Sequence, residues 1–451
     1  MKVLNVLFHG FHETAPVAMG RLAYQRGIAA FEYSNEFLSR AIEVSPVHLH
    51  LQAGLVQCER GVPDGLHGLF HDSLPDGWGL LLMDRAFQSR GIDPSTVSPI
   101  DRLAFVGSRG MGALSYEPDE GVHNVPAVES QFDLAKAGAE ATQIFEGTLE
   151  EVIDYHTIHG TPSGGARPKL LVGIDGDGNA IAGSEDLPTG YEHWIVKFPT
   201  GSTPDKKAEG AMEYVFAKMA KASGIDMAEP KLIPADDSNA YFATKRFDRI
   251  GQNERNHIHS VAGLLNTNFR DPNYEYIKLI KLTLNITKSV AEQREVFLRM
   301  LFNVISGNRD DHTKNFAFMM SPDGEWRNTP AFDLTFNEGI AGEHNMTISG
   351  KGKGISLEDI LKVGAYASLT EKGVLTLVEQ VRHGTSLWSD LAKDHGVPKT
   401  KINQVETYIN KQSTSFSPLR IATFGEHLNS IGDDPGKGEI KDGHNSKGPS
   451  M

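Results

Sequence analysis

The chain has 451 residues, 39% hydrophobic and 23% charged, a composition that can bury the cores of two or three domains rather than one. The formal net charge of −14 excludes a global basic field, so any contact with DNA would need a local basic patch or a partner protein. Cys58 is the only cysteine, which excludes an intrachain disulfide and is typical of a reducing cytosol.

The sequence predicts neither a signal peptide nor a membrane span. The apolar run at residues 3–8 is too short for a signal h-region and is broken by His9 and Gly10. No segment approaches about eighteen uninterrupted apolar residues, so we expect a cytoplasmic protein. The histidine pairs at 48/50 and 257/259 lack a third ligand at metal-site spacing, and we interpret them as structural or surface residues.

The first 125 residues or so have the pattern of a mixed, β-containing region with many turns. The turn-forming run Asp72–Trp78 leads into a predicted helix that passes through Leu82 and Arg85. Residues 107–112 are rich in glycine but lack the GxGxxG pattern and a following helix. We interpret them as a loop before a strand.

A helical stretch is predicted over 126–157, followed by a glycine-rich loop at 160–169. The backbone amides of this loop are free to approach phosphates, and Lys169 places a cation at its end. The loop matches neither GxGxxG nor GxxxxGK[ST], because Arg167 and Pro168 stand between its glycines and Lys169. A plain flexible connection would explain the glycines but not the two neighbouring cations. A strand at 170–174 and a hairpin turn at 175–179 follow.

The segment 193–199 alternates like a half-buried strand. Trp194, Val196 and Phe198 share one face, and Ile195 and Lys197 share the other. A lysine in mid-strand is costly to bury unless an anion meets it. Nucleotide phosphates would be such an anion. The alternative is an edge-strand lysine with its ammonium in water.

A helix is predicted over 205–223, with Gly224 as its C-terminal stop. On this helix Glu213 is the preferred partner for Lys197, and Glu209 is the alternative. Residues 241–247 form the next predicted strand.

From about residue 270 the pattern is helical. Ser289 and Glu292 predict a capping box. A core-facing stripe at helical spacing then leads directly into the loop 307–315. Its residues are Phe297, Met300, Leu301, Val304 and Ile305. Further helices are expected near 356–363, 370–382 and 400–411, and the tail 433–451 is predicted to be disordered.

The loop GNRDDHTKN at 307–315 carries the strongest functional signal. Asp310 lies five residues before Asn315, and Asp333 follows eighteen residues after Asn315. Protein kinases use this layout, with an Asp that accepts the hydroxyl proton and an Asn and Asp that hold magnesium. Taken singly, these residues would be interpreted as a solvated loop aspartate, a turn residue and a cap.

Residues Lys245–Phe247 lie where a kinase links its two lobes. Backbone groups there would hydrogen-bond adenine, and Phe247 could cover its ring. The alternative interpretation is an ordinary strand end.

Together these motifs resemble the HipA family of bacterial serine/threonine kinases, the toxins of HipBA-type toxin–antitoxin systems. The resemblance covers roughly residues 20–420, and SGGARPK and DDHTKN are its most specific motifs. The motifs are DSLPDGWG (72–79), GMGAL (110–114), SGGARPK (163–169), HWIVKFP (193–199), KRFDR (245–249), HSVAGLL (259–265), GNRDDHTKN (307–315) and AFDL (331–334).

The resemblance implies an α+β, protein-kinase-like bilobal fold with an additional β-rich N-terminal subdomain and a helical C-terminal lobe. We expect the N-terminal subdomain at 1–125, the N-lobe with the glycine-rich loop at 126–244, and the C-lobe at 245–432.

The resemblance also implies a role for each site residue. Asp310 would be the catalytic base, and Asn315 and Asp333 would hold magnesium. The glycine-rich loop, Lys197, the 245–247 segment and the catalytic loop would bind ATP. These ATP-binding residues are Gly164, Gly165, Ala166, Arg167, Pro168, Lys169, Lys197, Lys245, Arg246, Phe247, His312, Thr313, Lys314, Asn315 and Asp333.

Two positions depart from the family pattern. Family members can phosphorylate a serine in the glycine-rich loop, but Pro162 stands at that position here. Ser163 is the preferred site of autophosphorylation, and Thr161 is the alternative. Lys245 stands where the best-known member carries an acidic residue, so only its backbone role is transferred.

The resemblance implies an ATP- and Mg-dependent serine/threonine kinase toxin whose targets include aminoacyl-tRNA synthetases. It also implies a HipB-like helix-turn-helix antitoxin as partner, with DNA contacted only through that antitoxin, and no membrane. The competing hypotheses are a catalytically silent corepressor that binds an antitoxin on DNA, and a small-molecule kinase.

Overall fold

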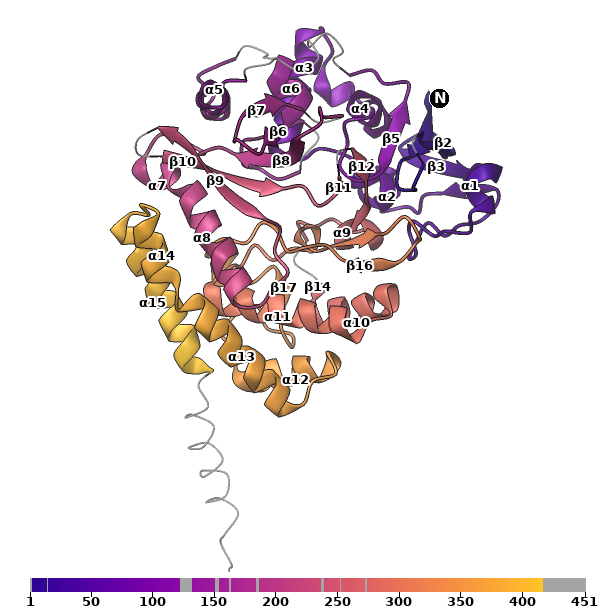
Figure 1. Cartoon of the computed structure of the whole chain (residues 1–451). Helices are drawn as coiled ribbons and strands as arrows, with labels where there is room; N and C mark the ends of the chain where they lie inside the picture. The colour runs from indigo at the N-terminus through magenta and orange to yellow at the C-terminus, as the bar shows by residue number, and fades with distance from the viewer. Residues whose placement is uncertain are drawn as a thin grey trace, which may run out of the picture.

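The computed structural model describes residues 2–13, 15–121, 132–150, 154–161, 164–183, 186–236, 239–251, 253–271 and 274–416. Within these ranges two five-stranded antiparallel sheets are followed by a mainly helical region (Figure 1). The predicted disordered tail at 433–451 lies outside the described residues. None of the helices in the described ranges has the length and apolar character needed to cross a bilayer.

The first sheet forms the N-terminal subdomain, with the strand order β4-β3-β2-β1-β5. Alternate residues of its first strand, Leu4, Val6 and Phe8, are fully buried in a core that belongs to this subdomain. This is the period-2 pattern of a sheet with one covered face. Its strands are β1 (Lys2–Phe8), β2 (Val17–Gln25), β3 (Ile28–Tyr33), β4 (Leu55–Gln57) and β5 (Leu114–Glu117). Four helices accompany the sheet: α1 (Asn35–Ser39), α2 (Gly68–His71), α3 (Gly77–Ser89) and α4 (Pro99–Val106).

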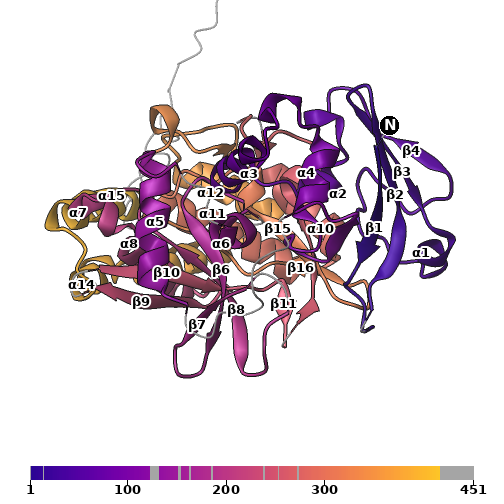
Figure 2. The ribbon, with the colours of Figure 1, turned by 90° about the horizontal axis from the view of Figure 1, so that it is seen from above.

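The second sheet has the order β7-β6-β8-β10-β9, and helix α5 lies across it in Figure 2. Trp194, Val196 and Phe198 are buried in one cluster with α5, so Lys197 faces the opposite side, as the alternation predicted. The strands are β6 (Lys169–Asp175), β7 (Ala180–Ala182), β8 (Tyr191–Lys197), β9 (Pro230–Asp236) and β10 (Asn239–Lys245). The described part of the predicted helical stretch 126–157 contains α5 (Leu134–Glu146) and the start of α6 (Asp154–Gly160).

The predicted helix 205–223 is interrupted at Ala208 and forms α7 (Pro204–Lys207) and α8 (Glu209–Ala222). Helix α8 ends as expected, because Gly224 adopts a φ of 79° immediately after the C-cap Ser223.

Helices dominate the rest of the chain, in agreement with the helical pattern predicted from about residue 270. Short strands also form in this part of the chain, from residue 249 onward. The helices are α9 (Val261–Leu264), α10 (Tyr276–Thr287), α11 (Val290–Ser306), α12 (Leu357–Tyr366), α13 (Glu371–Thr385), α14 (Trp388–Asp394) and α15 (Lys399–Ser415). The short strands are β11 (Arg249–Ile250), β12 (Glu254–Arg255), β13 (His257–Ser260), β14 (Tyr274–Glu275), β15 (Ala317–Met320), β16 (Trp326–Asn328) and β17 (Met346–Thr347).

Helix α11 delivers the chain into the 307–315 loop. Every residue of its predicted apolar stripe is buried. The helix stops at Gly307, which has a φ of 80° and whose N–H donates to the Asn303 carbonyl. Only half of the predicted capping box forms. The Ser289 hydroxyl accepts from the Glu292 N–H, but the Glu292 carboxylate accepts from the Asn328 N–H instead.

Buried carboxylates join the N-terminal subdomain to the rest of the chain. Asp72 accepts from the Ser260 N–H, the Ser260 hydroxyl and His259 Nδ1, at 2.6–2.7 Å. His257 Nε2 lies 2.8 Å from the Val44 carbonyl. Both histidines therefore hold the subdomain in place, in agreement with their predicted structural role.

Asp248 makes the second buried link. It is fully buried, and it accepts from Arg246, from Arg249 and from the backbone N–H of Gly112 in the N-terminal subdomain. Burial by itself would raise the pKa of Asp248, but the two guanidinium groups outweigh it and hold the pKa below its ordinary value.

We expect Asp248→Ala to lower the free energy of unfolding by about 3–5 kcal/mol, because it leaves two buried guanidinium groups without their carboxylate. Since the folded-state pKa is depressed, this stabilisation is present above the unfolded-state pKa of about 3.9 and is lost as the pH falls towards the folded-state pKa. Urea denaturation at pH 7 and in acid tests both parts. As a control, Asp390→Ala at a side chain that is 89% exposed should change stability by less than about 0.5 kcal/mol. Equal losses in the two variants would contradict the prediction.

Candidate functional site

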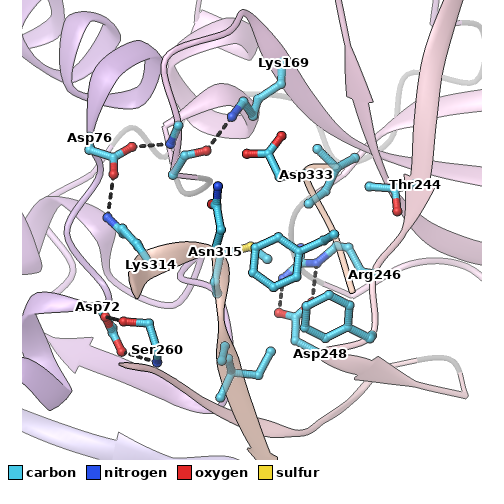
Figure 3. A pocket seen from close by; sticks show the side chains of 18 of the residues that line it. Asp72, Asp76, Lys169, Thr244, Arg246, Asp248, Ser260, Lys314, Asn315 and Asp333 are labelled. Atoms are coloured by element: carbon cyan, nitrogen blue, oxygen red, sulfur yellow. Dashed lines mark hydrogen bonds and ion pairs between the residues drawn. The ribbon is translucent and has the colours of Figure 1, made fainter. Parts of the chain in front are cut away.

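A cavity of about 410 Å³ lies between the second sheet, the N-terminal subdomain and the loop that follows α11. Figure 3 shows that Lys169 points into the same space as Asn315 and Asp333, which come from a distant part of the sequence. The volume is in the range of small-molecule sites.

Lys197 is held in the site by two carboxylates. Its ammonium lies 2.5 Å from Glu213 Oε1 and 2.6 Å from Asp333 Oδ1, and the residue is only 7% exposed. Burial alone would lower the pKa of Lys197, but the two carboxylates outweigh it and raise the pKa. Of the two glutamates considered, Glu213 is the partner, while Glu209 bonds the N–H and hydroxyl of Thr200.

Lys169 lies directly opposite Lys197 in the β6–β8 pair. Like charges on directly opposed residues of a sheet repel each other. Burial and the neighbouring Lys197 lower the pKa of Lys169 to about 8. The Lys169 ammonium also donates to the Gly164 carbonyl, so it folds back on the glycine-rich loop. Two facing cations at the floor of a cavity form a site suited to a polyanion.

The 307–315 loop places its two adjacent aspartates in different environments. Asp311 is fully buried and accepts from the Tyr276 hydroxyl at 2.8 Å and the Asn345 N–H at 2.8 Å, so it anchors the loop. Asp310 lines the cavity, and its side chain is 47% exposed. Burial, with Asp333 and Asp311 nearby, raises the pKa of Asp310, although His312 acts in the opposite direction. Asp310 is therefore the aspartate of this pair that can reach a substrate.

Asn315 and Asp333 supply oxygen atoms to the same cavity. Asn315 Nδ2 donates to the Asp310 carbonyl at 2.8 Å, which leaves Asn315 Oδ1 as its ligand atom. The positive charge of Lys197 is the main cause that lowers the pKa of Asp333, and Lys169 and the hydrogen bond from Lys197 act in the same direction. The Asp333 carboxyl group is therefore ionised. Oxygen-only donors of this kind fit magnesium, which takes one or two carboxylates and fills its remaining positions with water and phosphate. The described residues contain no group of three or more His, Cys, Asp or Glu side chains arranged for a metal.

The opposite end of the cavity is apolar. The rings of Phe247 and Phe332 lie 5.6 Å apart at 36°, and Met111 and Met227 are among the other apolar residues that line the cavity. A flat aromatic ligand would fit such an environment.

Backbone pairing in the 245–247 segment limits what a ligand can use. The N–H of Lys245 donates to Glu229 and that of Arg246 donates to His193, both at 2.9 Å. The Lys245 side chain pairs with Glu192 at 2.6 Å, so a ligand would meet its backbone rather than its ammonium.

Most of the predicted site residues that the structure describes line this cavity: Gly164, Gly165, Ala166, Lys169, Lys197, Lys245, Arg246, Phe247, Asp310, His312, Lys314, Asn315 and Asp333. Arg167, Pro168 and Thr313 are not among its lining residues. Arg167 instead donates to Glu213 at 2.7 Å and to the Phe198 carbonyl at 2.8 Å, so it supports the partner of Lys197.

Of the two candidate autophosphorylation sites, the structure describes only Thr161. Ser163 lies outside the described residues. Thr161 is 3% exposed. Its hydroxyl is therefore shielded from the cavity in this conformation.

The N-terminal subdomain contributes to the lining of the cavity, which was not predicted from the sequence. Met111 and Ala113 line it from the glycine-rich connection before β5, and Asp76 lines it from the turn before α3. The sequence contained this information, because the two segments fall within the motifs GMGAL (110–114) and DSLPDGWG (72–79) of the family resemblance. Because both segments are rich in turn-forming residues, they were interpreted only as loops that connect secondary-structure elements.

Comparison with known proteins agrees with this arrangement. Residues 161–388 match the HipA-like C-terminal domain, and residues 14–117 match the HipA N-terminal domain. The chain belongs to the HipA family. A Sinorhizobium fredii protein named as a candidate kinase, Y4dM, is 26% identical over 361 residues, or 75% of this chain and 80% of the relative. The serine/threonine-protein kinase toxin HipA of Shewanella oneidensis is 24% identical over 288 residues, or 58% of this chain and 60% of the relative.

Among solved structures, the Shewanella oneidensis HipA in a complex with HipB and operator DNA superposes with a TM-score of 0.66 at 17% identity. The match covers 92% of this chain and 96% of that protein. The predicted α+β, kinase-like fold with an added β-rich subdomain is thereby confirmed for this HipA-family protein.

Proposed function

We propose that this HipA-family protein is an ATP- and magnesium-dependent protein serine/threonine kinase that acts as the toxin of a toxin–antitoxin system. The observation that carries the proposal is the pair of contacts made by Lys197, to Glu213 and to Asp333, beside Asp310 and Asn315 in one cavity. A lysine–glutamate ion pair and a correctly placed metal-binding aspartate are the two requirements of an active protein kinase.

Each end of the cavity has a function in this proposal. The two lysines would hold the triphosphate, and the aromatic end would hold adenine. Within the described part of the chain the N–H of Phe247 has no hydrogen-bond partner, unlike those of Lys245 and Arg246, so it could donate to the base. Asn315 Oδ1 and the Asp333 carboxylate would hold magnesium, which would neutralise charge on the β- and γ-phosphates.

Asp310 is positioned to accept a proton from the acceptor hydroxyl. As that oxygen bonds to the γ-phosphorus, the bond from the γ-phosphorus to the β-bridging oxygen breaks, and ADP leaves with the electron pair. Asn345 Nδ2 lies 3.4 Å from Asp310 Oδ1 and also donates to the Arg309 carbonyl at 2.9 Å, so it orients the base. Correct placement of the base contributes as much to the rate as its basicity does.

Radiolabelled ATP, incubated with the purified protein and cell lysate, tests the reaction class. A labelled protein band supports the kinase, and phosphoamino-acid analysis of that band reports serine or threonine. A labelled metabolite would instead indicate a small-molecule kinase. Nucleotide binding without any labelled product would indicate a silent corepressor.

The target and the partner rest on the family resemblance rather than on the geometry of the cavity. We propose a translation component, such as an aminoacyl-tRNA synthetase, as the substrate, to be identified by phosphoproteomics of cells that express the wild type or Asp310→Ala. We also propose a HipB-like antitoxin, because the structural relative was solved with HipB and operator DNA and the net charge here is −14. In gel-shift assays we then expect the antitoxin to retard operator DNA and this protein to slow that complex further, whereas this protein alone should leave the DNA unretarded.

The charge state of Lys169 predicts how nucleotide binding depends on pH. Its pKa of about 8 means that the nucleotide-free protein loses this cation as the pH rises through 8, while bound phosphates favour the protonated form. We therefore expect ATP affinity to fall above pH 8 and binding to take up a proton there. Calorimetric titrations in buffers of different ionisation enthalpy measure the uptake. Lys169→Met should bind more weakly at pH 7 and lose this pH dependence, whereas an unchanged dependence in the variant would contradict the assignment.

A further inference from the structure

The start of helix α3, in the N-terminal subdomain, is docked directly on the glycine-rich loop. The backbone N–H of Trp78 donates to the Gly165 carbonyl at 3.1 Å, and the Trp78 indole donates to the Lys169 carbonyl at 2.9 Å. In return, the Gly165 N–H donates to the Asp76 carboxylate. Both sides of the loop backbone are thus bonded to residues of another subdomain.

The docking requires glycine at the contact. A Cβ on Gly77, which has a φ of 44°, would come within 2.6 Å of Ala166 Cα and 2.7 Å of the Gly165 carbonyl. A Cβ on Gly79 would come within 2.4 Å of the Thr161 carbonyl. These clashes are with backbone atoms, which cannot swing away as a side chain can. The approach between α3 and the loop is therefore a built feature of the fold.

Asp76 extends this contact to the catalytic loop. Its second oxygen lies 2.5 Å from the ammonium of Lys314, one residue before Asn315, as the dashed lines in Figure 3 show. Asp76 is the N-cap residue of α3, but its side chain makes no capping bond to its own helix. An aspartate at an N-cap ordinarily accepts from the helix N–H groups. Here the carboxylate bonds instead to the two loops that border the cavity.

The electrostatics of Asp76 agree with this geometry. Burial alone would raise the pKa of Asp76, but Lys314 and the Gly165 N–H outweigh it and keep the pKa below its ordinary value. The carboxylate is therefore ionised at neutral pH, and both of its hydrogen bonds are charge-assisted.

We propose that Asp76 is a positioning residue that holds the glycine-rich loop closed against the catalytic loop, so that the N-terminal subdomain sets nucleotide affinity. The proposal rests on the proposed function in one respect, namely that the cavity binds a nucleotide. Without Asp76 the loop would have to be ordered at the moment of binding, and that ordering opposes affinity.

Two measurements on Asp76→Asn test this role: hydrogen exchange of residues 164–169 without nucleotide, and the dissociation constant of a fluorescent ATP analogue. We expect faster exchange in the loop and a dissociation constant about tenfold higher, since a charge-assisted hydrogen bond is lost. The matched control is Asp84→Asn on the same helix, whose carboxylate pairs with Arg102 at 2.7 Å, away from the loop. The control should change neither quantity.

Exchange and affinity that are unchanged in Asp76→Asn, or changed equally in Asp84→Asn, would overturn the proposal. If Asp76→Asn fails to fold, Lys314→Gln removes the other half of the ion pair, and loop exchange again decides. Faster exchange supports the clamp, and unchanged exchange overturns it. Hydrogen exchange is measured without nucleotide, so it tests the role of Asp76 even if the wild type binds no ATP. Failure of the wild type to bind ATP would contradict the proposed function but not the role of Asp76.

Discussion

Replacing Asp310 by alanine should slow phosphoryl transfer by about 10²- to 10⁴-fold while nucleotide binding is retained. Asp310 lines the cavity and, among the described residues, has no ion pair with lysine or arginine, so its loss removes a proton acceptor without breaking such a salt bridge. Single-turnover assays with labelled ATP measure the rate, and titration with a fluorescent ATP analogue measures binding. The control Asp323→Ala, at a side chain that is 80% exposed in the same lobe, should leave both unchanged.

The same base predicts how the rate depends on pH. Only the ionised carboxylate can accept a proton, and burial raises the pKa of Asp310 above its ordinary value of about 3.9. On acidification, activity should therefore be lost at a higher pH than it would be if Asp310 had the ordinary pKa of an aspartate. A rate for Asp310→Ala close to that of the wild type would remove Asp310 from the mechanism and would direct attention to another base.

Replacing Asp333 by asparagine should reduce the rate by at least about 10³-fold, because it removes a metal-binding carboxylate. The variant differs from Asp310→Ala in which step fails. Magnesium should tighten nucleotide binding to the wild type and to Asp310→Ala, but should tighten it far less in Asp333→Asn.

The fold should tolerate this change, since Lys197 keeps its bond of 2.5 Å to Glu213 and asparagine retains an oxygen that can accept from the ammonium. Chemical denaturation of Asp333→Asn checks that assumption. Magnesium-dependent nucleotide binding that is undiminished in the variant would show that Asp333 is not a metal ligand, whatever the rate.

The N-terminal subdomain changes how this kinase-like cavity is built. In a two-lobed arrangement the glycine-rich loop would contact only its own sheet and the ligand. Here α3 bonds the loop on both sides of Gly165, Asp248 links the 245–247 segment to Gly112, and Asp72 anchors β13. A partner that binds the N-terminal subdomain could therefore alter nucleotide affinity through direct contacts, without a long pathway across the protein.

Local pattern in the sequence was enough to predict much of this protein. The alternation around Trp194 placed Lys197 on the opposite face from the apolar residues, and the stripe on α11 identified a buried helix that ends at Gly307. These predictions succeed because a face of a strand or helix is set by periodicity within a few residues. Asp310, Asn315 and Asp333 likewise belong to one stretch of the chain that follows α11, so their spacing can be recognised in the sequence.

Tertiary structure alone decided which side chains meet. Asp310 and Asp311 are neighbours with the same chemistry, and only the approach of Tyr276 and Asn345 makes Asp311 the buried anchor. Arg167 follows the glycine-rich loop in sequence, yet it turns to Glu213. Asp76 lies 238 residues from Lys314. No local propensity records a contact over that separation, because it arises from the packing of one subdomain on another.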